Sequence, residues 1–318
     1  MSRYEAATIG PSCLPFTSRQ RWSHDDGLTA ILNVWHDNSN HSAPTFIIMQ
    51  SRRELIKSLL VRALPLPGWM KDGSRFGEHN VELIYDRIVV RVVNLQHEAT
   101  RLLQENCLPN SEADKLNNEA RELSEALHSW LVNHIPGTCI FQRHIVTDHS
   151  PWPRRHFYSS TVYSYPKPAY ATAWSQCFVL SMIIESIRCK VLGRRQRNPL
   201  VESIYGQERQ ECVTRLKTMA DNLAASVPFS LARFKVDDSS TNQPSITLNT
   251  NDEIKPYQAR LIVWPLVIAA GIEELDSGQR MWFKHELTSL GKITGDGLFE
   301  CAKAARMRSS KSEIGGPR

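Results

Sequence analysis

His144 and Asp148 come nearer to a catalytic motif than any other pair in this chain. Their His-x-x-x-Asp spacing is one in which the histidine can act as a general base and remove a proton from an acceptor. His149 stands where a glycine usually follows, and 11 histidines make one such spacing common by chance. Residues 136–168 therefore stay an alternative centre for a small-molecule enzyme or binder, while the main expectation is that the chain is not an enzyme.

Other catalytic and phosphate-binding patterns are incomplete. Gly291 and Lys292 match the end of a phosphate loop, but Glu286 occupies the position of the leading glycine, whose turn lets backbone amides surround a phosphate. The chain has no Gly-x-Ser-x-Gly segment that would hold a serine at a strained turn for attack. We assign no catalytic residue and expect no cofactor.

The metal-ligating residue types are not spaced for a metal. Tetrahedral zinc takes thiolates or imidazoles in close pairs, and the seven cysteines include no Cys-x-x-Cys. His144, His149 and His156 lie in one proline-rich stretch and could converge, although surface histidines are the more common outcome. We expect no metal site.

Basic residues are concentrated in one part of the chain. Between Glu185 and Glu202 there are five cations and no acid, which could form a patch for an acidic partner. Within this stretch, Arg194, Arg195 and Arg197 follow a glycine and form a run that a nuclear-import receptor could hold. The run predicts a nuclear protein. A solvated helix end in a cytoplasmic protein is the alternative, since cations are favourable near helix C-termini.

Composition is typical of a globular protein inside the cell. The chain has 318 residues, 41% of them hydrophobic and 22% charged, with a formal net charge of +5. The N-terminal residues contain no apolar segment of signal-peptide length, and the longest apolar block, residues 178–184, is too short for a membrane span. The odd number of cysteines is not typical of a secreted disulfide framework. We expect no membrane contact.

Apolar residues recur at steps of three and four along most of the chain, which predicts helices and no ladder of strands. The clearest helix is expected at residues 111–135, and residues 169–192 are apolar nearly all round, as in a helix buried inside a fold. Ser51 and Glu54 form a capping-box pattern, although this helix could already begin near Pro44. The other helices are expected at residues 26–35, 51–63, 84–102, 202–226, 257–275, 278–290 and 295–306.

These helices predict an all-α fold of stacked antiparallel helices, a helical array or bundle with long loops. Residues 136–168 and 236–256, rich in proline or polar residues, are expected to be the loops. One helical domain is expected over residues 24–306, with a disordered N-terminus at 1–23 and a disordered tail at 307–318.

The closing helices hold a proline and two tryptophans. Pro265 lies inside the helix expected at residues 257–275 and should bend it, because proline lacks an amide hydrogen. Trp264 beside it and Trp282 on the next helix are expected to pack into one core.

Four segments that occur in a definite order suggest a family. They are His24-Asp25-Asp26-Gly27-Leu28-Thr29-Ala30-Ile31-Leu32, the segment from Arg52 to Leu60 with its exit Pro65-Leu66-Pro67-Gly68-Trp69, the segment from Tyr158 to Trp174, and Trp264-Pro265 with Arg280-x-Trp282. In content and order they resemble the fungal-specific regulatory domain that follows the DNA-binding zinc cluster in fungal transcription factors. The resemblance runs from about His24 to Arg306.

The resemblance implies transcription regulation through protein contacts: homodimers or heterodimers, other transcription regulators or co-regulators, and sensing of an effector. It carries no catalytic residues. Family members typically begin with six cysteines in paired halves that hold two zinc ions and direct a basic helix at DNA, and this chain has no such module. We therefore expect no sequence-specific DNA binding by this chain alone. A third possibility is a gene whose true start lies upstream of Met1 and encodes the zinc cluster.

Overall fold

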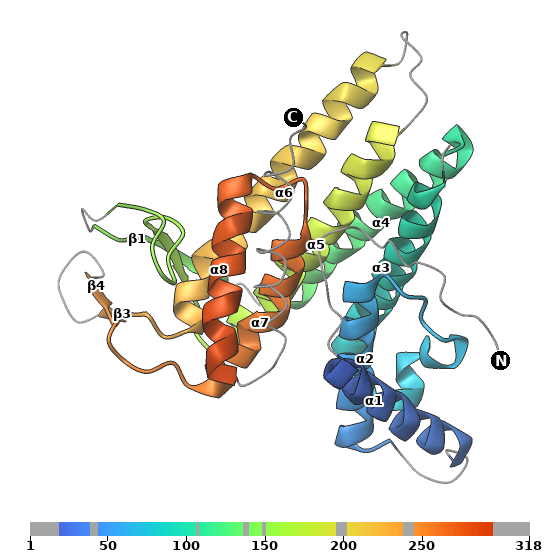
Figure 1. Ribbon diagram of the computed structural model, residues 1–318, viewed down its shortest axis with the longest axis horizontal. Coiled ribbons are helices and arrows are strands. Elements are labelled where there is room, and N and C mark those ends of the chain that lie inside the picture. Colours follow the sequence, from blue (N-terminus) through green and yellow to red (C-terminus); the bar gives the residue numbers. More distant parts are fainter. Residues whose placement is uncertain are drawn as a thin grey trace, which may run out of the picture.

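A computed structural model describes residues 19–38, 44–105, 108–135, 140–147, 151–194, 202–237 and 245–294. Helices make up most of these residues, which confirms the predicted all-α fold (Figure 1). The α-helices of the described ranges are α1 (Arg19–Asn38), α2 (Phe46–Arg62), α3 (Asn80–Gln104), α4 (Asn110–His134), α5 (Pro168–Arg194), α6 (Glu202–Ser230), α7 (Pro256–Gly271) and α8 (Ser277–Thr294).

Helices that follow one another along the chain pack together. α1 packs on α2 and α2 on α3, while α3 and α4, α5 and α6, and α7 and α8 form hairpin-like pairs (Figure 1). α3, α4, α6 and α7 also contact α5, which lies between the other pairs. The stacked-pair arrangement expected from the sequence is present in the described part of the chain.

Two short strand pairs interrupt the helices. β1 (Gln142–Ile145) pairs antiparallel with β2 (Thr161–Ser164), and β3 (Phe234–Asp237) pairs antiparallel with β4 (Ser245–Leu248). The expectation that residues 136–168 and 236–256 are only loops is therefore wrong. Four residues are too few to show an alternating pattern, and β2 hides its pattern further because neighbouring Val162 and Tyr163 are both buried.

Several predicted helix ends are also wrong. α1 begins at Arg19, before the start expected at residue 26, and ends at Asn38. The N-cap of α2 is Thr45, whose hydroxyl accepts a hydrogen bond from the Ile48 amide at 3.4 Å, which confirms the alternative start near Pro44. Ser51 is buried inside the helix, so the capping box at Ser51 is wrong. α7 ends at Gly271. Residues 1–18 and the predicted helix 295–306 and tail 307–318 lie outside the described residues.

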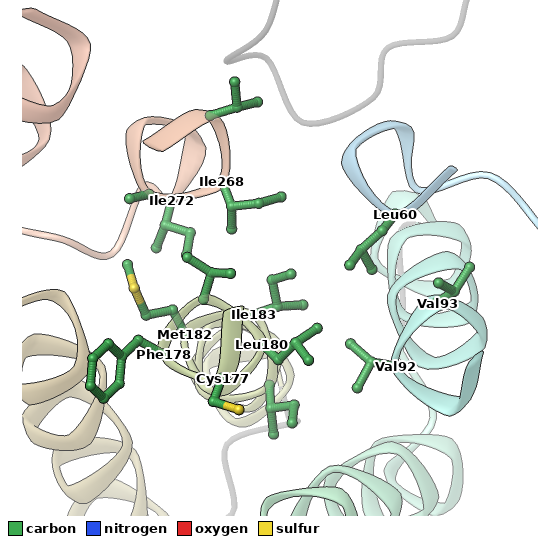
Figure 2. Close-up of a cluster of buried hydrophobic side chains, with 14 of the residues drawn as sticks. Leu60, Val92, Val93, Cys177, Phe178, Leu180, Met182, Ile183, Ile268 and Ile272 are labelled. Atoms are coloured by element: carbon green, nitrogen blue, oxygen red, sulfur yellow. The ribbon is translucent and has the colours of Figure 1, made fainter. Parts of the chain in front are cut away.

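The centre of the core is α5. Its residues 177–180 and 182–189 are all buried, so neighbouring helices cover every side of this stretch, as expected from its sequence. Figure 2 shows apolar side chains of α5 among side chains from α2, α3 and the C-terminal end of α7. The labelled residues of this cluster are Leu60, Val92, Val93, Cys177, Phe178, Leu180, Met182, Ile183, Ile268 and Ile272.

A buried ion network joins the same helix to α4 and α6. The Arg188 guanidinium, 4% exposed, donates to Glu185 Oε2 at 3.1 Å, to Glu208 Oε1 at 2.7 Å and to Asn117 Oδ1 at 3.1 Å. Asn117 in turn donates to Glu208 Oε1 at 3.0 Å. Counting Arg188 in an exposed basic patch is therefore wrong, because its charge is neutralised inside the fold.

We expect Arg188→Met to destabilise the protein strongly, because it leaves the Glu185 carboxylate buried without its closest cation. Breaking a buried pair in this way lowers the free energy of unfolding by about 3–5 kcal/mol. Urea unfolding followed by circular dichroism measures the loss. Arg215→Met is the matched control: its side chain is 56% exposed and 3.9 Å from Glu185, and it should lose less than about 1 kcal/mol. Equal unfolding midpoints for the two variants would contradict a structural role for the network.

Candidate functional site

The structure does not bring His144 and Asp148 together as a catalytic pair. His144 lies on β1, is 8% exposed, and its Nε2 is 2.7 Å from the Ser164 hydroxyl on the paired strand. Asp148 lies outside the described residues. A histidine and a serine at this distance could act as base and nucleophile, but neither residue lines any of the cavities described below. The contact therefore cross-links the strand pair.

His156 is a second buried histidine, and nothing in the sequence indicated that it pairs with an acid. The backbone amide of His156 donates to Glu286 Oε1 at 2.8 Å, and its Nδ1 lies 2.7 Å from Glu286 Oε2. His156 adopts the left-handed backbone conformation, with φ of 67°. This geometry fastens the loop before β2 to α8, and it explains why a carboxylate occupies the position where a phosphate loop would need glycine. No local sequence signal links these residues, which are 130 positions apart.

A cavity of about 390 Å³ opens where α2 and α3 meet α5 and α7. This volume lies within the range of small-molecule sites. Apolar and aromatic side chains form most of the wall, and amide and charged groups form the rest. The lining residues are Gln50, Arg53, Ile56, Lys57, Leu60, Glu78, Val81, Glu82, Tyr85, Asp86, Val89, Trp130, Ala173, Gln176, Leu180 and Trp264.

Ion pairs hold the charged side of the cavity. Arg52, which is fully buried, donates to both carboxylate oxygens of Asp86 at 2.6 and 3.0 Å and to the carbonyl oxygen of Met70 at 2.9 Å. Arg53 makes a two-pronged contact with Glu78, with Nε 2.7 Å from Oε1. These pairs join α2 to α3 and to the turn before it, because two-pronged arginine–carboxylate contacts fix both position and angle.

Aromatic side chains form another part of the wall. Trp264 on α7 donates its indole N–H to the Lys57 carbonyl oxygen on α2 at 3.4 Å. Trp130 on α4 donates to the Val81 carbonyl oxygen at 3.2 Å, and its ring centroid lies 4.7 Å from that of Tyr85. Both indole N–H groups are thus satisfied by the protein, and the ring surfaces remain available to the cavity.

Trp264 and Trp282 face different elements, although both pack against the main apolar cluster. Trp282 is 6% exposed, contacts the rings of Phe283 and Tyr158, and donates its N–H to the Arg154 carbonyl oxygen at 3.1 Å. Trp264 is only partly buried. Trp282 is therefore buried in the core, as expected. Trp264 is only packed against this core, and its side chain forms part of the cavity wall. α7 continues through Pro265, and the bend expected there stays a prediction.

Large apolar side chains on α1 and at the start of α2 are exposed. We call Ile31, Val34, Phe46 and Ile47 the α1–α2 apolar face; their exposed fractions are 48%, 62%, 70% and 68%. A shallow hollow beside them is lined by Ala30, Ile31, Val34, Trp35 and Ile48. The sequence showed these residues only as apolar positions, since helical spacing does not tell whether a neighbouring helix covers them.

Arg194, the first residue of the predicted import run, is the last residue of α5. Arg194 is exposed, and Arg195 and Arg197 lie outside the described residues. The buried cysteines Cys189 and Cys212 lie together behind this end, on α5 and α6, as free thiols.

The described residues contain no group of three or more histidine, cysteine or acidic side chains placed to hold a metal ion. Among these residues no helix combines the length and hydropathy needed to cross a bilayer. No protein-family model, curated protein or solved structure matches the chain. The function is therefore argued from the geometry above.

We expect Trp282→Ala to destabilise the protein more than Trp264→Ala. Removing the buried Trp282 ring leaves a hole in the core, with a loss of about 3–5 kcal/mol. Trp264→Ala should lose roughly 1–2 kcal/mol, since a partly exposed ring removes less area from water. Urea unfolding of both variants tests this order. A larger loss for Trp264→Ala would show that this ring is the core residue of the two.

Proposed function

We propose that this protein is a transcription-regulator-like helical domain that acts through contacts with other proteins, without a DNA-binding zinc cluster of its own. Two lines of argument support the proposal. The sequence segments from His24 onwards resemble a fungal regulatory domain, and a stacked helical array is the architecture that this resemblance implies. Dimerisation and binding of co-regulators are the contacts that we expect.

The α1–α2 apolar face is the observation that carries the proposal. Ile31, Val34, Phe46 and Ile47 present side chains that are about half or more exposed. Exposed large apolar side chains are unfavourable in water, and patches of them are typical of protein–protein contacts. This face lies on the N-terminal helix pair, α1 and α2 (Figure 1). A second protein chain that covers it would bury these side chains.

A catalytic function centred on residues 136–168 has less support. His144 is buried against Ser164, and the cavity with the volume and lining of a ligand site lies between other helices. We propose no enzymatic activity.

Fusing the chain to a heterologous DNA-binding module should change expression of a reporter that carries the module's site. Replacing Phe46→Glu and Ile47→Glu should weaken this effect roughly tenfold, because a carboxylate placed in an apolar contact loses its hydration without gaining a partner. Reporter expression and protein level are measured together.

The matched control is Ile145→Glu, which adds a charge at another apolar side chain, 52% exposed on β1. It should leave the reporter effect unchanged. Sedimentation equilibrium of the wild type and of the double variant separates self-association from contact with a different protein. A wild-type fusion that leaves the reporter unchanged would contradict regulation, and a double variant with full effect would exclude this face.

We expect the import run to direct the protein to the nucleus. A fluorescent fusion with Arg194→Ala, Arg195→Ala and Arg197→Ala should lose nuclear enrichment, since import receptors hold such runs by their positive charge. Microscopy of living cells measures the nuclear-to-cytoplasmic ratio.

The control for charge removes three arginines exposed on other helices, by Arg87→Ala, Arg121→Ala and Arg260→Ala. This variant should keep the wild-type distribution. If the run variant also keeps it, the run is a solvated helix end.

A further inference from the structure

The cavity between α2, α3, α5 and α7 has no part in the contacts proposed above, and its lining has the character of a ligand site. Its inner wall includes Leu60 and Leu180, which are 1% and 0% exposed, and its sides include the rings of Tyr85, Trp130 and Trp264. Such a wall favours a flat, largely apolar molecule, because ring stacking and removal of apolar surface from water both contribute to binding.

The charges of the wall favour a neutral molecule. The two basic side chains of the lining each have an acidic partner within the protein: Arg53 pairs with Glu78, and Lys57 with Glu54. The lining carboxylate of Asp86 is paired with the buried Arg52. The remaining acid of the lining, Glu82, is exposed to water at the rim. A charged ligand would lose its own hydration, and no buried countercharge is left to replace it.

Hydrogen-bonding groups remain to orient a ligand. The Tyr85 hydroxyl donates to Gln176 Oε1 at 3.5 Å, which is a long contact, and no described residue bonds the Gln176 amide nitrogen. Burial raises the pKa of Tyr85 well above its usual value, so the hydroxyl stays neutral. The Gln50 side chain also lines the cavity. These groups can donate to and accept from a carbonyl, hydroxyl or amine.

We propose that this cavity is the binding site of a neutral, planar, mainly apolar small molecule that carries one or two hydrogen-bonding groups. The ligand lies between Trp264 on one side and Tyr85 with Trp130 on the other, and it bonds Gln176. It contacts both α2 and α7, the two helices that the Trp264–Lys57 hydrogen bond joins. The proposal does not depend on a role in transcription.

Two fluorescent probes with the same ring system test the charge preference. N-phenylnaphthylamine is neutral and has one N–H, whereas anilinonaphthalene sulfonate adds an anionic group, and both become bright on leaving water. The purified full chain should bind the neutral probe at one saturable site. Its affinity for the anionic probe should be lower by roughly tenfold or more.

Variants locate the site. Ala173→Phe and, one turn along α5, Gln176→Phe each fill the cavity from a partly exposed position and should weaken binding of the neutral probe roughly tenfold or more. Phe46→Glu with Ile47→Glu, which alters the α1–α2 apolar face, should leave the affinity within about twofold. Circular dichroism without probe shows which variants are folded. One folded variant of the two that fill the cavity is enough for the binding test.

The proposal is overturned if the neutral probe does not saturate, if the anionic probe binds equally well, or if a folded filling variant binds like the wild type. Loss of binding only in the Phe46→Glu and Ile47→Glu variant would place the probe on the α1–α2 apolar face instead. A reporter effect without probe binding would leave the proposed regulatory function intact and remove only the ligand site.

Discussion

The burial of α5 on every side is the constraint on which the rest of the structure depends. This 27-residue helix has apolar residues nearly all round, so no side of its middle section can face water without a large loss of hydrophobic free energy. α3, α4, α6 and α7 therefore pack against it together. Arg188 and Glu185 are the charged exceptions, and they are tolerated because Glu208 and Asn117 complete their hydrogen bonding.

α2 connects the two surfaces to which we assign functions. One side of the helix lines the cavity with Arg53 and Lys57, and its first turn carries Phe46 and Ile47 of the α1–α2 apolar face. The buried ion pair of Arg52 and Asp86 joins α2 to α3. A molecule in the cavity and a protein on the face would thus both contact α2.

The sequence was a good guide to helices and a poor one to strands and caps. α4 and α5 are long enough for a repeating pattern to be unmistakable, and their predicted ends lie within two residues of the observed ones. β1 and β3 contain four residues each, and such short strands are stable only when a second strand pairs with them. The start of α2 near Pro44 was an open alternative, but Thr45 was not identified as the cap because Ser51 offered a fuller capping pattern inside the same helix.

Local patterns in the sequence by themselves determined that the chain is helical, that the middle of the helix expected at residues 169–192 is buried, and that Trp282 belongs to the core. Each of these follows from spacing within one or two helices. Only the tertiary structure decided which distant groups meet. The ion pair of Arg52 with Asp86, the contact of His156 with Glu286 and the link from Trp264 to Lys57 span 34, 130 and 207 positions. The cavity depends on such contacts, because its wall comes from five helices whose relative placement is set by packing around α5.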